Sequence, residues 1–475
     1  MIKVNIGKQI EIIDTNDGLF TSSKNLSELY DWCEKNLVVT NPMYDQLLRL
    51  GKEDTIKYKH VPEKLYLYAQ KGKTLVLPFG CLFGIWKFIK EFEINLNFNV
   101  SSPLGIENNE LPIELYDYQK RAVEVMTRAK GGILVAPCGA GKTIMGIEIL
   151  HRLNRKFLWL THTKDLLNQA LDDMKQLFPN IDVGLITEGK VEIGRDGAIA
   201  TIQTLVNIDP DLYADQFEVV VCDECHHVCG SPTISKMFSK VINKIPARYK
   251  YGLTATPERS DTLLKTMYTL IGMSYKGEFE PTYCIDRKEI NTMEAEHIKF
   301  DVELNYGYEI LNSDGTLDYN TMIDYLSDKK ERNDIIIEQV QKLQSENRKQ
   351  VVLCHRVRHV EYLCKELVEK GVRAKMVVGK LNNKKRKEVL ENCDNWDVMV
   401  ATYSLLKEGI SIKQLDTLHL TTPQKNKSMI VQCAGRIERY LEGKNQPLIY
   451  DYVDINVPYC VGAYRKRKSS LKNRF

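Results

Sequence analysis

Glycines, a lysine and a threonine lie together in the stretch 132–144, GILVAPCGAGKTI. The apolar residues 133–136 predict a buried strand, and the run 144–153 predicts a helix. In the turn between them, glycines let backbone N–H groups approach phosphate oxygens, and the start of the helix adds partial positive charge. We expect Lys142 to hold the β- and γ-phosphates of ATP and the hydroxyl of Thr143 to bind Mg²⁺. The predicted nucleotide-binding residues are Pro137, Cys138, Gly139, Ala140, Gly141, Lys142 and Thr143.

Two adjacent carboxylates, Asp223 and Glu224, follow the apolar run Val219–Cys222. Phosphate cleavage with a metal needs one carboxylate that binds Mg²⁺ and another that polarises the attacking water. We assign Asp223 to the metal and Glu224 to the role of general base. The alternative is a strand that ends in a surface Asp–Glu pair, which we would favour if the phosphate loop were absent. In the phosphate loop, Ala136 replaces the first glycine of the strict G-x-x-x-x-G-K-[ST] pattern. The carboxylate pair strengthens the interpretation of this loop, because the variant motif does not stand alone.

Cysteines and histidines around these carboxylates suggest a zinc site as a rival interpretation. Structural zinc sites usually pair two Cys-x-x-Cys knuckles, and only one such spacing occurs in this stretch. Cys222 also lies in a strand whose apolar neighbours predict burial. We therefore favour packing over zinc binding for these side chains, which are Cys222, Cys225, His226, His227 and Cys229.

An amide and two arginines form a third group, Gln432, Arg436 and Arg439. On a helix, positions i, i+4 and i+7 lie on one face, so we expect the three side chains to point the same way. Two guanidiniums on such a face can stabilise the charge that develops on a triphosphate during hydrolysis. We assign all three a catalytic role. Ordinary surface arginines on a helix are the alternative.

Strands and helices alternate from Leu111 onward, which predicts an α/β fold with parallel sheets in two tandem lobes. The expected strands of the first lobe are 133–135, 157–160, 198–202, 219–222 and 251–254. Those of the second lobe are 351–354, 374–378, 398–401, 417–420 and 448–453. We place the first lobe at 109–280, a hinge with an inserted element at 281–340, and the second lobe with a basic tail at 341–475.

Residues 1–108 mix short strand-like and helix-like segments and predict a small α+β accessory domain, followed by a linker at 101–112. Several aromatic side chains here can stack on nucleobases or fill a core. The helical spacing of Leu82, Trp86 and Ile89 favours the core. The tail, with Arg465, Lys466, Arg467, Lys468, Lys472 and Arg474, is basic enough to hold phosphates, but a solvated, disordered end is equally compatible.

Composition limits the class of protein. With 475 residues and 43% hydrophobic content, the chain has material for two or three domains. The apolar run 75–86 is interrupted by Pro78 and is too short for a spanning helix, and residues 1–21 lack the pattern of a signal peptide. The 12 scattered cysteines suit a reducing compartment, so we expect a cytoplasmic protein, in the host cytoplasm if it is viral. The net charge of +3 requires local patches for any polyanion partner.

The motifs and their order along the chain resemble those of a superfamily 2 helicase of the DExH type, over about residues 111–455. The resemblance implies two RecA-like lobes. The matching segments are 115–119, the phosphate loop, 161–169, 201–204, 223–226, 253–257, 352–356, 401–409 and 432–439. The details are closest to the branch that contains the XPB, UvsW and RecG helicases.

The resemblance also implies residue roles. It assigns Gln119 and Gly409 to the nucleotide, with Gln119 contacting the base. It assigns contact with the nucleic-acid strand to Thr161, Thr204, Arg356 and Thr402, although each threonine alone is equally suited to capping a helix. Coupling between hydrolysis and the nucleic-acid grip falls to His226, Thr254 and Thr256.

We therefore expect an ATP-dependent DNA helicase or translocase that unwinds or remodels duplex, forked or branched DNA, acts as a monomer and does not bind membranes. An RNA-directed motor that releases transcripts is the alternative among helicases. A double-stranded DNA translocase or clamp that separates no strands is the alternative outside them.

Overall fold

The computed structural model describes residues 2–15, 24–101, 103–104, 112–187, 189–228, 237–255, 263–306, 317–379, 388–390, 392–404 and 412–472. The chain forms two compact units, residues 1–285 and 286–475, which we describe one at a time. Among the described residues, none of the helices combines the length and apolarity that are needed to cross a bilayer.

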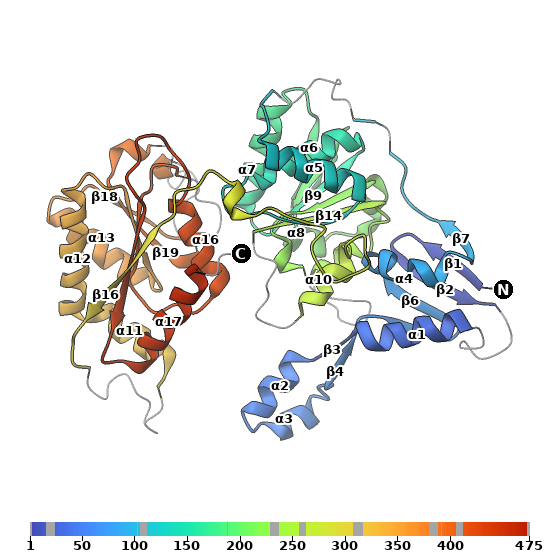
Figure 1. Ribbon diagram of the computed structural model, residues 1–475, viewed down its shortest axis with the longest axis horizontal. Coiled ribbons are helices and arrows are strands. Elements are labelled where there is room, and N and C mark those ends of the chain that lie inside the picture. Colours follow the sequence, from blue (N-terminus) through green and yellow to red (C-terminus); the bar gives the residue numbers. More distant parts are fainter. Residues whose placement is uncertain are drawn as a thin grey trace. The chain divides into compact units, whose positions relative to one another are not determined.

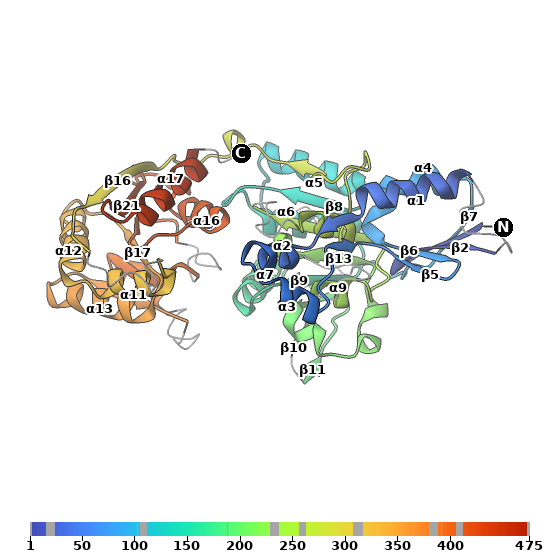
Figure 2. The ribbon, with the colours of Figure 1, turned by 90° about the horizontal axis from the view of Figure 1, so that it is seen from below.

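The first unit begins with an α+β domain built on a five-stranded sheet in the order β5-β6-β2-β1-β7. Helices α1 and α4 cover one face of this sheet (Figure 2), and their apolar side chains join those of the strands in one core. In α4, Ile89 is buried and Leu82 packs against the core, as the sequence spacing predicted, but Trp86 is 46% exposed and Ile85 and Phe88 are buried instead. The elements are β1 (Ile2–Ile6), β2 (Gln9–Asp14), α1 (Lys24–Asn36), β5 (Ala69–Lys71), β6 (Thr74–Pro78), α4 (Leu82–Ile89) and β7 (Glu93–Leu96).

A small arm extends from this domain between α1 and β5 (Figure 1). It consists of a two-stranded ribbon, β3 (Val38–Thr40) with β4 (Lys64–Tyr66), and two short helices, α2 (Pro42–Arg49) and α3 (Glu53–Tyr58), neither of which has a buried residue. Asn41 closes its base, because its side chain accepts a hydrogen bond from Met43 N and donates one to Pro62 O.

The accessory domain packs directly on the lobe that follows it. At Gly80, an added Cβ would lie 2.3 Å from Tyr268 O, and Gly80 O accepts a hydrogen bond from Met273 N at 3.0 Å. Ser101 donates its backbone N–H and its hydroxyl to Glu218 Oε2, at 3.0 and 3.1 Å. The segment that the sequence predicted as a linker is therefore hydrogen-bonded to the lobe at Ser101.

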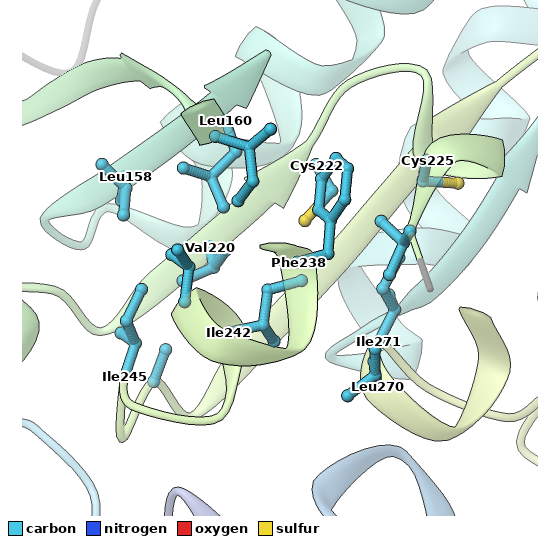
Figure 3. Close-up of a cluster of buried hydrophobic side chains, with 14 of the residues drawn as sticks. Leu158, Leu160, Val220, Cys222, Cys225, Phe238, Ile242, Ile245, Leu270 and Ile271 are labelled. Atoms are coloured by element: carbon cyan, nitrogen blue, oxygen red, sulfur yellow. The ribbon is translucent and has the colours of Figure 1, made fainter. Parts of the chain in front are cut away.

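The second part of the first unit is an eight-stranded sheet in the order β11-β10-β12-β9-β13-β14-β8-β15, parallel except for β11. Its central strands are buried along their whole length, which is why their sequences are continuously apolar. Figure 3 shows side chains of β9, β13, α9 and α10 in the core on one face of the sheet. The elements are α5 (Asp117–Ala129), β8 (Gly132–Val135), α6 (Lys142–Leu153), β9 (Phe157–Thr161), α7 (Lys164–Leu177), β10 (Val183–Thr187), β11 (Lys190–Val191), β12 (Gly197–Thr201), α8 (Ile202–Val206), β13 (Val219–Cys222), α9 (Met237–Ile242), β14 (Tyr249–Thr254), α10 (Leu264–Leu270) and β15 (Tyr283–Cys284).

The second unit contains a six-stranded, all-parallel sheet in the order β16-β21-β20-β17-β19-β18. The predicted α/β fold with parallel sheets is therefore confirmed. The elements are β16 (Glu296–Val302), α11 (Tyr319–Asp328), α12 (Lys330–Gln344), β17 (Gln350–Cys354), α13 (Val357–Glu369), β18 (Ala374–Val377), β19 (Val398–Thr402), β20 (Thr417–Leu420), α16 (Lys427–Ile437), β21 (Leu448–Asp454) and α17 (Pro458–Lys472).

Two segments of this unit differ from the sequence interpretation. The hinge and inserted element, predicted at 281–340, contribute to this unit the edge strand β16, helix α11 and most of α12. Strand β16 pairs with β21 over seven residue pairs. The basic tail is helical from Pro458 to Lys472. Arg467 within it is buried and forms an ion pair with the buried Asp451 at 2.5 Å, so this arginine belongs to the core; Arg474 lies outside the described residues.

Candidate functional site

The predicted phosphate loop and the carboxylate pair end at the same edge of the first lobe's sheet. Strands β8, β14 and β13 are neighbours and run parallel, with Val135 opposite Thr254 and Gly252 opposite Cys222. The carboxyl ends of parallel strands form the usual ligand-binding edge of such a sheet. The topology therefore brings residues 136–143 and 223–224 to one place.

The phosphate loop has the backbone conformation that its glycines permit. Gly139 and Gly141 have φ of 87° and 79°, a region that side chains disfavour. An added Cβ at Gly141 would lie 2.5 Å from Gln119 Nε2, so this position is also closed sterically. Ala136 is not among the residues with positive φ, and its N–H donates to Thr254 O at 2.9 Å. Alanine is therefore tolerated at the position where the strict pattern has glycine.

Gln119 lies against this loop and holds it in place. Its Oε1 accepts a hydrogen bond from Tyr116 N at 3.0 Å, and its Nε2 donates to Ala140 O at 2.8 Å. The aromatic ring of Tyr116 stacks on that of Tyr118, with centroids 5.6 Å apart. The side chain that the family resemblance assigned to the nucleobase thus also connects the start of α5 to the phosphate loop.

Lys142 and Asp223 have the environments expected of a phosphate and metal site. Lys142 Nζ donates to Ala136 O at 3.4 Å, within its own loop. Asp223 is only 6% exposed, and burial, reinforced by the charge of Glu224, raises the pKa of its carboxyl, while Lys142 opposes the rise. A bound cation would stabilise this buried carboxylate, and oxygen ligands such as Asp223 and the hydroxyl of Thr143 are those that Mg²⁺ prefers. The residues therefore fit Mg²⁺.

Glu224 is held in an unusual conformation beside two histidines. Its φ is 46°, in the left-handed region that residues other than glycine rarely adopt. Glu224 Oε2 lies 3.3 Å from His226 Nδ1, and the same nitrogen forms a 3.1 Å hydrogen bond with Thr254 Oγ1. The predicted base is therefore connected through His226 to the end of β14.

Contacts also run from this group to the neighbouring strand ends. The rings of His226 and His227 lie 4.1 Å apart, and the ring of His227 stacks on that of His162 at 4.2 Å. His162 Nδ1 forms a 3.2 Å hydrogen bond with Gln203 Nε2. The sequence analysis considered His227 only as a possible zinc ligand and gave His162 and Gln203 no individual role. Only the order of the strands brings the three side chains together.

The threonines predicted to contact a nucleic-acid strand in the first lobe do not reach the surface. Thr161 is 0% exposed and donates its hydroxyl to Thr163 O at 3.1 Å. Thr204 is buried, and its hydroxyl bonds that of Thr201 at 2.9 Å, where Thr201 caps α8. Both side chains therefore form local hydrogen bonds, but the helix-capping role that the sequence left open belongs to their neighbours Thr163 and Thr201, which cap α7 and α8.

The group in the second unit is split between a helix and the segment that follows it. Helix α16 contains Gln432, which is buried, and Arg436, but it ends at Ile437. Arg439 lies beyond the helix and forms an isolated antiparallel bridge with Thr292. The prediction that all three lie on one helical face is therefore wrong.

Glu438 is the reason why the helix ends there. Its backbone O accepts a hydrogen bond from Met293 N at 2.8 Å, and its carboxylate accepts one from Ala295 N at 3.1 Å and pairs with Arg287 at 2.6 Å. These tertiary contacts replace continuation of the helix.

Three further positions named in the sequence analysis, Thr256, Gly409 and Cys229, lie outside the described residues.

The remaining nucleic-acid candidates lie at strand ends of the second sheet. Thr402 ends β19, is 9% exposed, and its hydroxyl bonds that of Ser404 at 3.2 Å. Arg356 precedes α13, and its side chain, 34% exposed, pairs with Asp324 at 2.7 Å. Arg356 is thus accessible but already bound to a carboxylate.

The cysteines of the rival zinc interpretation are part of the core in the described region. Cys222 and Cys225 are buried among apolar side chains (Figure 3), and Cys225 Sγ lies 3.7 Å from Met267 Sδ. Burial raises the pKa of the Cys222 thiol to about 12, which disfavours the thiolate that zinc binds.

Comparison with known proteins gives the family. Residues 112–259 match the family model "Type III restriction enzyme, res subunit", and residues 331–440 match "Helicase conserved C-terminal domain". The matched segments contain the phosphate loop, the Asp223–Glu224 pair and Arg436 in the expected order. The chain belongs to the superfamily 2 helicases. It is an ATP-hydrolysing helicase with two tandem RecA-like lobes.

Relatives of this helicase include viral proteins. It is 25% identical over 464 residues, 92% of this chain and 83% of the relative, to a protein of Acanthamoeba polyphaga mimivirus provisionally named an ATP-dependent RNA helicase. It is 24% identical over 409 residues, 80% of this chain and 79% of the relative, to the ATP-dependent DNA helicase uvsW of Enterobacteria phage T4. The solved structure of the ATP-dependent type ISP restriction-modification enzyme LlaBIII bound to DNA has a similar fold, with a TM-score of 0.53 at 18% identity, covering 76% of the helicase and 30% of that chain.

Proposed function

We propose that this helicase couples ATP hydrolysis to movement along DNA and unwinds or remodels duplex or branched DNA. The observation that carries the proposal is the connection of Glu224 through His226 to Thr254. It joins the predicted general base to a strand end of the motif that the family uses for coupling. A motor needs such a connection, because a bound strand must change the rate of hydrolysis.

The proposed chemistry assigns one task to each side chain of the first lobe. Lys142 binds the β- and γ-phosphates, and Glu224 orients the attacking water and accepts its proton. Asp223 and Thr143 would hold Mg²⁺, which when bound neutralises charge on the phosphate oxygens. Gln119 keeps the loop in position and contacts the base. We further propose that Arg436 and Arg439 stabilise the charge that develops on the phosphate during hydrolysis.

The preference for DNA rests on the relative from phage T4, which is named a DNA helicase and aligns over most of both chains. The mimivirus relative is named an RNA helicase and aligns over an even larger share of this chain, which favours an RNA-directed motor as the second candidate. Both candidates share the same ATPase chemistry, so only the nucleic acid that stimulates hydrolysis separates them.

One experiment tests the function and the base together. We would measure steady-state ATP hydrolysis with junction DNA, duplex DNA and single-stranded RNA, and strand displacement on a forked DNA duplex. We expect junction or duplex DNA to stimulate hydrolysis most and the forked strand to be displaced. Stronger stimulation by RNA would instead support the second candidate. Hydrolysis without displacement would indicate a translocase that separates no strands.

The variant Glu224→Gln tests the assignment of the general base, because it keeps the size of the side chain and removes its basicity. We expect it to bind ATP as the wild type does and to lose at least about 100-fold in turnover, within the range of general-base contributions. Turnover close to that of the wild type would remove Glu224 from the mechanism.

A further inference from the structure

Helix α11 has an apolar face that anchors it and a polar face that meets two arginines. Met322, Ile323 and Leu326 are buried and pack with the start of α17. The polar residues Asn320 and Asp324 lie at i and i+4, and Asp328 follows at i+8, so the three share one side of the helix. Sequence periodicity signals this stripe, although its target is not visible in the sequence.

The target is the pair of guanidiniums at the start of α13. Asp324 Oδ1 accepts a hydrogen bond from Arg356 Nε at 2.7 Å and lies 2.9 Å from Arg358 Nη2. Arg356 Nη2 also donates to Asn320 Oδ1 at 3.0 Å. Asp328 differs, because it pairs with Arg358, at 3.0 Å, and among the described residues with no other arginine. One carboxylate oxygen of Asp324 therefore lies between both arginines.

The position of α11 is set by a second contact at the strand ends. The hydroxyl of Tyr319 lies 3.1 Å from His355 Nε2 and donates to Pro423 O at 3.2 Å. His355 Nδ1 in turn bonds Thr422 Oγ1 at 2.6 Å. The first turn of α11 is thus tied to the ends of β17 and β20, which keeps the carboxylate of Asp324 beside residue 356.

We propose that Arg356 and Arg358 together bind one phosphate of the nucleic-acid backbone, and that Asp324 occupies the position of that phosphate when no strand is bound. Two guanidiniums that share one oxyanion form the donor arrangement that phosphates bind. The side chains of Asp324, Arg356 and Arg358 are 41%, 34% and 53% exposed, so solvent screens the ion pairs and a phosphate can displace the carboxylate.

This inference rests on the proposed nucleic-acid motor and adds a residue, Arg358, and a built-in competitor, Asp324. The proposal predicts the direction in which removing the Asp324 carboxylate changes the affinity for nucleic acid. If Asp324 only positioned Arg356, its removal would weaken binding. If it competes with phosphate, its removal strengthens binding.

The test compares Asp324→Asn with Asp328→Asn, two variants with the same change of charge on the same helix. Binding of a fluorescein-labelled oligothymidylate and of a labelled duplex would be measured by anisotropy across a series of salt concentrations. We expect Asp324→Asn to bind about three- to fivefold more tightly at low salt, the effect of removing one charge about 5 Å from a phosphate in a water-like dielectric. We expect less than about twofold for Asp328→Asn, since it does not contact Arg356.

Two further variants complete the test. Arg358→Gln should weaken binding. It should also make the slope of log affinity against log salt concentration shallower, by the amount expected for the loss of about one phosphate contact. When both Arg356→Gln and Arg358→Gln are present, the gain from Asp324→Asn should disappear, because Asp324 then has no guanidinium to compete for. Equal or weaker binding by Asp324→Asn, or a gain that persists without both arginines, overturns the proposal. If the wild type binds neither probe, the proposed function itself fails.

Discussion

Single residues of the candidate site show how one side chain can carry a structural and a chemical role. Gln119 accepts a hydrogen bond from Tyr116 N and donates one to Ala140 O, so the amide that we propose contacts the base also holds the phosphate loop. Arg439 was predicted as part of a helix, but a bridge to Thr292 and a hydrogen bond from Lys444 Nζ to its carbonyl, at 2.7 Å, hold its backbone. A rigid backbone is what a residue needs if it is to meet developing charge without reorganisation.

At this scale we predict that Arg439→Ala lowers the maximal rate of ATP hydrolysis by about 10³-fold, the lower range for arginines that stabilise phosphoryl transfer. The affinity for ATP should change less than about threefold, because the arginine acts mainly in the transition state. Turnover and binding of a fluorescent ATP analogue measure the two effects. Arg128→Ala, at an exposed site of α5, is the control and should change neither quantity. If Arg439→Ala lost rate and affinity equally, Arg439 would not act mainly in the transition state.

At the scale of elements, the order β12-β9-β13-β14 places the ends of four strands side by side. Side chains from three of these ends form the continuous contact from Gln203 through His162 and His227 to His226 and Glu224. The stack of His162 on His227 is the step that joins the loop after β9 to the loop after β13.

We predict that His227→Ala lowers stimulation of the ATPase by nucleic acid about tenfold, since a packed aromatic contact contributes about 0.5–1.5 kcal/mol. His227→Phe keeps a ring at the same position and should restore stimulation. Hydrolysis measured with and without saturating duplex DNA separates this effect from basal turnover. If the alanine variant were stimulated as strongly as the wild type, the stack would have no part in coupling.

At the scale of the whole molecule, the accessory domain is part of the first unit because it packs on the lobe through buried groups. Lys250, at 1% exposure, lies beneath this contact; its Nζ is 4.7 Å from the centre of the Phe79 ring and donates to Ile242 O at 3.4 Å. Burial lowers the pKa of Lys250 to about 7. In the unfolded chain the same amine has a pKa of about 10.4.

The sign of the pH effect follows from these values. Between pH 7 and about 10.4 the unfolded chain binds more protons than the folded one, so the free energy of unfolding contributed by this site rises with pH. Below pH 7 the full cost of the buried charge remains. We therefore predict that Lys250→Met raises the thermal midpoint at pH 6.5, by an effect of about 1–3 kcal/mol, and that the gain shrinks towards pH 10.

Thermal denaturation followed by fluorescence at pH 6.5, 8 and 10 measures this difference. Lys244→Met, at an exposed position of the same region, is the control and should show no such trend. A midpoint that falls in Lys250→Met at all three pH values would show that the ammonium stabilises the contact instead.

The sequence by itself determined the class of the molecule. Apolar strands separated by helices predict parallel sheets, and motifs that follow strands predict a shared edge, because both rules depend on local periodicity and on the short reach of a turn. The phosphate loop, Asp223 and Glu224 were found this way.

The tertiary structure decided the contacts and the burial that local periodicity does not predict. It ended α16 before Arg439 through Glu438, buried the hydroxyls of Thr161 and Thr204, placed Arg467 in the core and set Asp324 between Arg356 and Arg358. Each of these outcomes depends on a partner far away in the chain or on burial by another element. Spacing along the chain records which side chains share a face, but the order and packing of the elements determine what that face meets.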